Sequence, residues 1–126
     1  MLTEGTNKIA EFLASADLYL LRKQRNMAGF MLHRAGEQAL HTMFLITTGM
    51  YLNTHSIGNL LRYCSMVYYR LPDIFPGNNE KNERLFRLLQ KAYTGRRYDI
   101  DYSIGMQDLE VLKKRVEELK GLSDRL

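Results

Sequence analysis

The sequence predicts an all-α protein: an antiparallel, up-and-down bundle of about five helices, in a single domain spanning residues 1–126. Three observations predict this fold class. Apolar residues recur at helical spacing along most of the chain. The only prolines, Pro72 and Pro76, lie close together, and no stretch alternates apolar and polar residues as a strand does. The composition, 45% hydrophobic and 25% charged, is that of a globular chain.

Helical spacing and the breaks between apolar runs define the expected elements. The helices are expected over residues 3–25, 27–49, 57–70, 80–93 and 106–119. In the first helix, the inward face is expected to hold Ile9, Phe12, Leu13, Ala16 and Leu20, with Lys23 at its end.

Local signals set the ends of these helices. Gly49 suits the left-handed position that closes the second helix, and Thr54 or Ser56 can cap the third. Residues 71–79 contain both prolines and a Gly-Asn-Asn run, so they are expected to form a loop. Gly121 lies just beyond the expected end of the last helix.

The second helix is apolar on most sides, which is typical of a helix at the centre of a bundle. His33, Glu37 and His41 follow one another along it at i, i+4 and i+8. Two of these side chains four residues apart can bind one metal ion. The three together span about 12 Å along the helix, so they cannot all bind the same ion. We expect instead no metal and a polar lock, in which His33, Glu37 and His55 fasten the connector after this helix. The alternative role for His55 is to face a ligand.

Positive charge gathers late in the chain. The net charge is +4, and residues 80–97 alone account for it. That segment carries a basic helical face followed by Arg96 and Arg97, and arginine side chains match phosphate groups well. Tyrosines 93, 98 and 102 are placed to stack on bases. The alternative is a solvated basic helix whose arginines pair with Asp99 and Asp101.

Other classes of function find no support in the sequence. It contains no phosphate-binding glycine loop, no dinucleotide motif, no nucleophile elbow and no metal-binding cysteine cluster. Cys64 is the only cysteine and is expected to be a packed side chain. No signal peptide and no apolar run of about 20 residues is present, so we expect a cytoplasmic protein without cofactor or membrane span.

Two stretches of this sequence together resemble the HEPN family, the higher eukaryotes and prokaryotes nucleotide-binding domain. They are FMLHRAGEQALHTMFLITTGMYLNTHSIGNLL and LFRLLQKAYTGRRYDIDYSI. The likeness covers residues 18–119 and is nearest to HEPN domains that follow a nucleotidyltransferase domain in some bacterial proteins. The matching positions are Leu32, His33, Glu37, Thr54, His55, Leu85, Phe86, Ala92, Tyr93, Arg97, Tyr98, Tyr102 and Ile104.

The resemblance implies an up-and-down bundle that is commonly dimeric. Many HEPN proteins are metal-independent ribonucleases, often toxins paired with a nucleotidyltransferase antitoxin, and they carry an arginine followed four to six residues later by a histidine. Arg97 matches that arginine, but no histidine follows His55 in this chain. Tyr102 lies in the corresponding window, and a tyrosine with a reference pKa of about 10 is a poor general base.

We therefore expect a non-catalytic HEPN domain that binds nucleotide or RNA phosphate through Arg96, Arg97, Lys91 and Tyr98. It is expected to form a homodimer and to work with a nucleotidyltransferase, fused or separate. One alternative is a metal-independent ribonuclease or toxin with a divergent site that uses Arg97 with Tyr102 or His55. Another is a structural dimerisation module without a ligand.

Overall fold

A computed structural model describes residues 2–54, 56–75, 79–95 and 104–125 of the chain. Throughout these residues the ordered elements are helices, which confirms the expected all-α bundle. Six helices lie within the described ranges: α1 (Leu2–Leu21), α2 (Arg25–Thr48), α3 (Ile57–Ser65), α4 (Leu71–Ile74), α5 (Glu80–Gly95) and α6 (Met106–Asp124). The sequence predicts about five helices, and the additional helix in the structure is the short α4.

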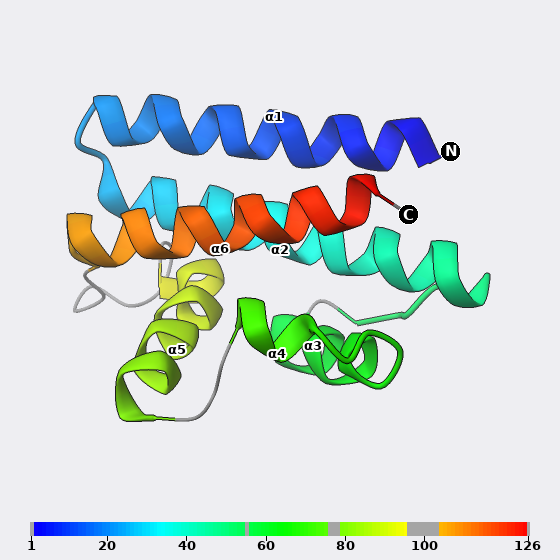
Figure 1. The fold of residues 1–126 in the computed structure, drawn as a ribbon. Helices are drawn as coiled ribbons and strands as arrows, with labels where there is room; N and C mark the ends of the chain where they lie inside the picture. The colour runs from blue at the N-terminus through cyan, green and yellow to red at the C-terminus, as the bar shows by residue number, and fades with distance from the viewer. Residues whose placement is uncertain (1, 55, 76–78, 96–103, 126) are drawn as a thin grey trace.

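Helix α2 lies at the centre of the bundle, as its apolar sequence predicts. It contacts α1, α3, α5 and α6. Figure 1 shows α1 antiparallel to α2, α6 alongside α2 and running in the same direction, and α3, α4 and α5 packed beneath this layer. The core residues that α2 contributes are Ala28, Leu32, Ala35, Ala39, Leu40, Met43 and Phe44.

The first helix ends earlier than predicted, at Leu21. Lys23 adopts a left-handed backbone conformation, with φ of 60°. The Gln24 N–H donates to the Tyr19 carbonyl at 2.8 Å and the Lys23 N–H donates to the Leu20 carbonyl at 3.0 Å. This pair of bonds is the Schellman motif, which closes a helix and reverses the chain. The prediction that Lys23 continues the inward face is wrong, because Lys23 lies beyond the helix and is exposed.

Both glycine and serine caps behave as their residue types predict. Gly49 closes α2 with φ of 73°, and its N–H donates to the Leu45 carbonyl at 2.8 Å. Ser56 caps α3, since its hydroxyl oxygen accepts a hydrogen bond from the Asn59 N–H at 3.3 Å. The connector between α2 and α3 therefore begins and ends where the sequence indicates.

The third helix and the following loop are predicted incorrectly. Helix α3 stops at Ser65, and residues 66–70 turn so that the Tyr68 hydroxyl bonds to Thr47 Oγ1 and donates to the Met43 carbonyl of α2. The chain then forms α4, where a loop was expected. Pro72 lies in the first turn of α4, where its fixed φ suits a helix and no N–H is needed.

Helix α6 is longer than predicted, since it ends at Asp124 rather than at residue 119. Gly121 lies inside it and does not close it. The inward face is as expected, with Leu109, Leu112, Val116 and Leu119 fully buried. No helix in the described ranges is both long enough and apolar enough to cross a membrane.

Cys64 is a packed side chain, as predicted. It is fully buried, and its thiol donates to the Leu40 carbonyl of α2 at 3.3 Å. Burial raises the pKa of the Cys64 thiol to about 12. The thiolate needed for nucleophilic chemistry is therefore suppressed.

Candidate functional site

The polar side chains of α2 form a buried ridge. His33, Glu37 and His41 are only 2%, 5% and 6% exposed. His33 Nδ1 lies 3.8 Å from Glu37 Oε2, as the i, i+4 spacing predicts. Glu37 Oε1 also accepts a hydrogen bond from Arg34 Nη1 at 3.2 Å. Glu37 thus has a hydrogen-bond partner, Arg34, on its own helix.

Arg34 ties this ridge to the first helix. Its guanidinium carbon lies 5.4 Å from the centre of the Phe12 ring on α1. A cation over an aromatic face is attracted electrostatically. Arg34 thus bridges α1 and Glu37. The i, i+3 spacing signals its contact with Glu37, which the sequence-based prediction missed, whereas its contact with Phe12 has no signal in the sequence.

Burial controls the protonation of His33. It lowers the pKa of His33 to about 4, while the Glu37 carboxylate raises this pKa and the Arg34 guanidinium lowers it. His33 is therefore neutral at neutral pH. A neutral imidazole can stay in the core at a much smaller cost than an imidazolium ion.

The connector after α2 is fastened to the ridge by Tyr51. The Tyr51 and His41 rings stack, with centroids 4.8 Å apart and planes 9° from parallel. His55 lies outside the described residues, so its part in the polar lock stays a prediction. Across the described ranges, no three His, Cys, Asp or Glu side chains gather as a metal site would require.

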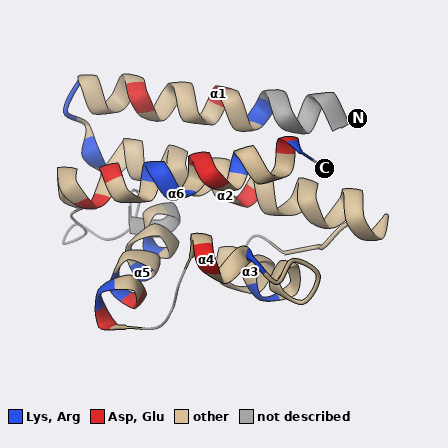
Figure 2. Ribbon diagram, viewed as in Figure 1, with Lys and Arg blue, Asp and Glu red and all other residues tan. Residues whose placement is uncertain are grey.

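Helix α5 carries the basic face that the sequence predicts. Arg84, Arg87 and Lys91 are exposed, whereas Leu85 and Leu89 on the other side of the helix are buried. Figure 2 shows the positive positions along α5, with acidic residues confined to its first turn. This arrangement leaves a positively charged surface that leads toward the end of α5 at Gly95.

One of these cations has a structural role. Arg84 donates from Nη1 and Nη2 to the two carboxylate oxygens of Asp108, at 3.1 and 2.9 Å. This hydrogen-bonded pair raises the pKa of Arg84 and joins α5 to the first turn of α6. Arg84 therefore joins two helices, whereas Arg87 and Lys91 are exposed farther along α5.

Most of the predicted ligand-binding residues follow α5 in the sequence. Arg96, Arg97, Tyr98 and Tyr102 lie outside the described residues, as do Asp99 and Asp101. Of the predicted ligand-binding residues, the structure places Lys91, exposed on the last part of α5. Helix α5 continues to Gly95, so Arg96 directly follows its last residue.

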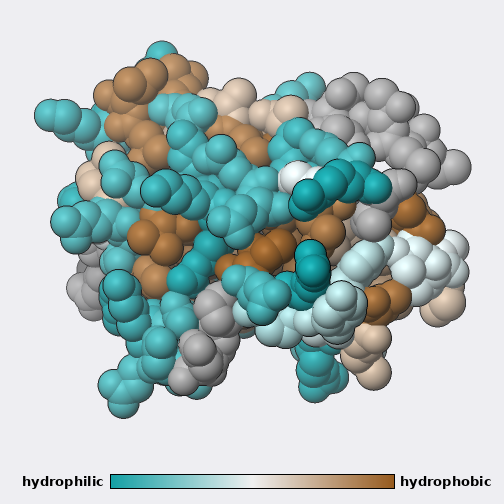
Figure 3. All heavy atoms as spheres, in the orientation of Figure 1, coloured by the Kyte–Doolittle hydropathy of each residue, from teal (hydrophilic) through white to brown (hydrophobic). Residues whose placement is uncertain are grey.

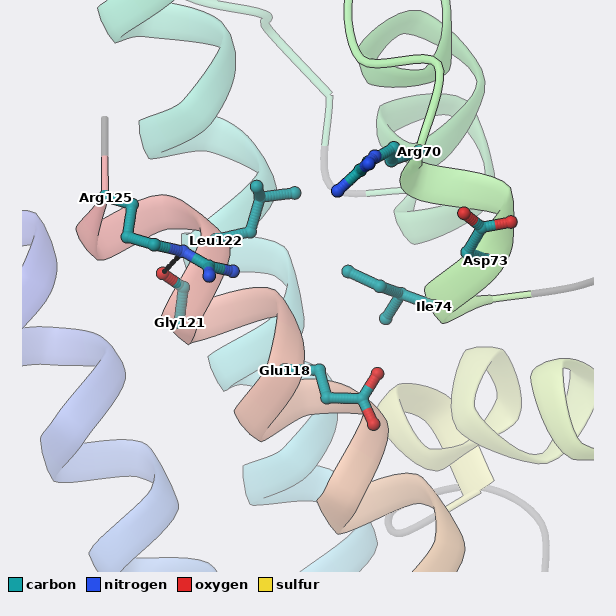
Figure 4. A pocket seen from close by; sticks show the side chains of 7 residues that line it. All are labelled: Arg70, Asp73, Ile74, Glu118, Gly121, Leu122 and Arg125. Atoms are coloured by element: carbon teal, nitrogen blue, oxygen red, sulfur yellow. Dashed lines mark hydrogen bonds between the residues drawn. The ribbon is translucent and has the colours of Figure 1, made fainter.

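A separate cleft of about 600 Å³ lies between α4 and α6, which the sequence analysis did not predict. Figure 4 shows Ile74 and Leu122 facing each other across it, with charged side chains around them. Arg125 Nε donates to the Gly121 carbonyl at 3.2 Å. The cleft is lined by Arg70, Asp73, Ile74, Glu118, Gly121, Leu122 and Arg125. Two carboxylates balance its two guanidinium groups, so it suits an anion less well than α5 does.

The described residues therefore define an all-helical domain built around the central helix α2, with an exposed basic face on α5. The family model of the HEPN domain matches residues 7–126. The chain belongs to the HEPN family, as its sequence motifs indicate. A comparison with curated proteins finds no match.

Proposed function

We propose that this HEPN domain is non-catalytic and binds the phosphate of a nucleotide or RNA. The ligand contacts are assigned to Arg96, Arg97, Lys91 and Tyr98. The domain acts as a cytoplasmic homodimer together with a nucleotidyltransferase, fused or separate, as in paired toxin–antitoxin systems. The proposal depends mainly on one observation: the sequence keeps the arginine of the family's ribonuclease motif but lacks the histidine that should follow it.

The basic face of α5 supports the binding half of this proposal. Arg87 and Lys91 are exposed on the part of the helix that leads into Arg96 and Arg97. Exposed cations close to one another attract a polyanion and raise its rate of encounter. Arginine then offers paired donors that match two phosphate oxygens.

The location of the histidines supports the non-catalytic half. A general acid or base must lie within hydrogen-bond reach of the proton that it transfers. His33 and His41 are buried in the ridge on α2, where a nucleic acid backbone has no access to them. His55 is the remaining histidine of the chain, and it lies outside the described residues.

RNA and nucleotide affinity of the full chain tests the proposal. Fluorescence anisotropy with labelled RNA, in the presence of EDTA, should show binding by the wild type and a loss of about tenfold or more for Arg97→Ala. Arg22→Ala is the matched control, because Arg22 is an exposed arginine just beyond the end of α1 and lies outside α5.

The same samples distinguish the alternative functions. Intact RNA after incubation agrees with a non-catalytic domain. Cleavage that Arg97→Ala abolishes would replace this proposal with a divergent ribonuclease. Equal affinity of wild type and Arg97→Ala, or no binding by either, would refute the assigned site.

A further inference from the structure

The end of α2, the connector after it and the α3–α4 turn form a surface with almost no charge. Arg62 is the only Lys, Arg, Asp or Glu from Gln38 to Tyr69, although such residues make up 25% of the chain. Figure 2 shows this region almost entirely in tan.

Large apolar side chains are exposed on this same region. It holds six of the nine exposed large hydrophobic residues in the described part of the chain, with exposed fractions from 39% to 84%. In Figure 3 the lower right of the molecule is accordingly pale or brown over much of its area. These six residues, here called the neutral patch, are Met50, Tyr51, Tyr63, Met66, Val67 and Tyr69.

The neutral patch is held in place by contacts with α2. Tyr51 stacks on His41, and Tyr63 packs edge-on against Phe44 with ring centroids 6.5 Å apart. The hydroxyl of Tyr68, in the turn between Val67 and Tyr69, bonds to α2. A surface fixed in this way loses little further entropy when a partner docks on it.

The residue types indicate a protein partner. Tyrosine and methionine are enriched in protein interfaces, whereas lysine, glutamate and aspartate are depleted from their centres. Monomeric proteins rarely expose a large apolar area of this kind without a binding role. The neutral patch therefore has the composition of an interface centre.

The lack of charge favours a second copy of this chain as the partner. In a two-fold symmetric contact the same patch is present on both sides, so a charged residue near the axis meets its own like charge. Arg62, the one cation of the region, lies over the Tyr63 ring, with its guanidinium carbon 5.6 Å from the ring centre. Two molecules of net charge +4 repel least when they approach through an uncharged face.

The remaining exposed apolar residues are less suited to such a contact. Leu18 and Leu21 are exposed at the end of α1, and Met106 is exposed at the start of α6. Arg22, Lys23 and Arg25 are exposed beside Leu21 in the sequence, so a symmetric contact there would bring together like charges. We propose that the neutral patch is the face through which two copies form a two-fold symmetric homodimer. This inference depends on the homodimer that is part of the proposed function, and it identifies the interface of that homodimer.

Sedimentation velocity of the full chain over a wide concentration range tests the assignment. The wild type and the control Leu21→Asp should dimerise with equal affinity, since Leu21 is 82% exposed and lies outside the neutral patch. Tyr69→Asp and Tyr69→Lys should both weaken dimerisation by about tenfold or more, because either charge meets its own copy. Circular dichroism should show unchanged folding, since Tyr69 is 84% exposed.

The outcomes separate this interface from the rest of the proposed function. A wild type that stays monomeric refutes both the neutral-patch contact and the homodimer. A dimer that Leu21→Asp dissociates, or that neither Tyr69 variant weakens, refutes the neutral patch alone. Opposite effects of Tyr69→Asp and Tyr69→Lys would show that a charged surface faces the patch, which also refutes it. RNA binding by the same variants reports independently on the arginine site.

Discussion

Lowering the pH from about 7.5 to about 5 should destabilise this protein through His33. His33 is 2% exposed in α2, and burial lowers its pKa in the folded protein to about 4, below the ordinary 6.5. As the pH falls through 6.5, the unfolded chain takes up a proton that the folded protein does not bind. The stability is therefore fully present above pH 6.5 and is lost as the pH falls toward 4.

The two pKa values set the size of this effect. For one histidine with a pKa of 6.5 unfolded and about 4 folded, the lost free energy of unfolding is about 2 kcal/mol at pH 5. It approaches about 3 kcal/mol below pH 4, where the folded protein also binds the proton. Either loss is a large fraction of the stability of an ordinary domain.

Urea denaturation followed by circular dichroism at several pH values measures this loss. His33→Gln is the control, because glutamine keeps a polar side chain and does not titrate. The wild type should lose about 2 kcal/mol more than His33→Gln between pH 7.5 and 5. Parallel pH profiles for the two proteins, or a His33 pKa near 6.5 in an NMR titration, would show that burial does not control this histidine.

Three further predictions test the packing and the backbone, and two of them include a control variant. Glu37→Ala should lower the free energy of unfolding by about 1–3 kcal/mol, because it removes a buried acceptor of Arg34, and an unchanged melting temperature would contradict the lock. Gly121→Ala should raise it by about 0.5–1 kcal/mol, since Gly121 lies within α6 and the added Cβ would have no atom within 4 Å apart from its chain neighbours and its own helix backbone. Gly36→Ala should lack this gain in the same thermal melt, because its added Cβ would lie 3.1 Å from a methyl group of α3. Lys23→Gly should raise the free energy of unfolding in urea by about 0.5–1 kcal/mol, because glycine adopts the left-handed conformation of residue 23 without steric strain. The control Arg22→Gly should lower this free energy. Equal effects of the two variants would show that the backbone at Lys23 is not strained.

The sequence predicts those parts of the fold that local chemistry determines. The end of α2 is predictable because Gly49 is the residue type that a left-handed cap prefers. The end of α1 is not, since a lysine occupies the equivalent position at Lys23. The end of α3 depends on Tyr68 reaching α2, a contact between residues far apart in the chain. Pro72 alone does not distinguish a loop from the first turn of a helix.

The candidate sites follow the same rule. The approach of His33 to Glu37 is predictable because both lie on α2 four residues apart. The stack of Tyr51 on His41 is not, because it depends on how the connector leaves α2. The contact between Arg84 and Asp108 requires two helices to meet, so the sequence shows both charges without showing that they pair.

The affinity of the full chain for RNA, compared between wild type and Arg97→Ala with EDTA present, tests the central claim most directly. The proposal predicts binding by the wild type, intact RNA, and an affinity lower by about tenfold or more in Arg97→Ala but unchanged in Arg22→Ala. Equal affinity of the wild type and Arg97→Ala would contradict it.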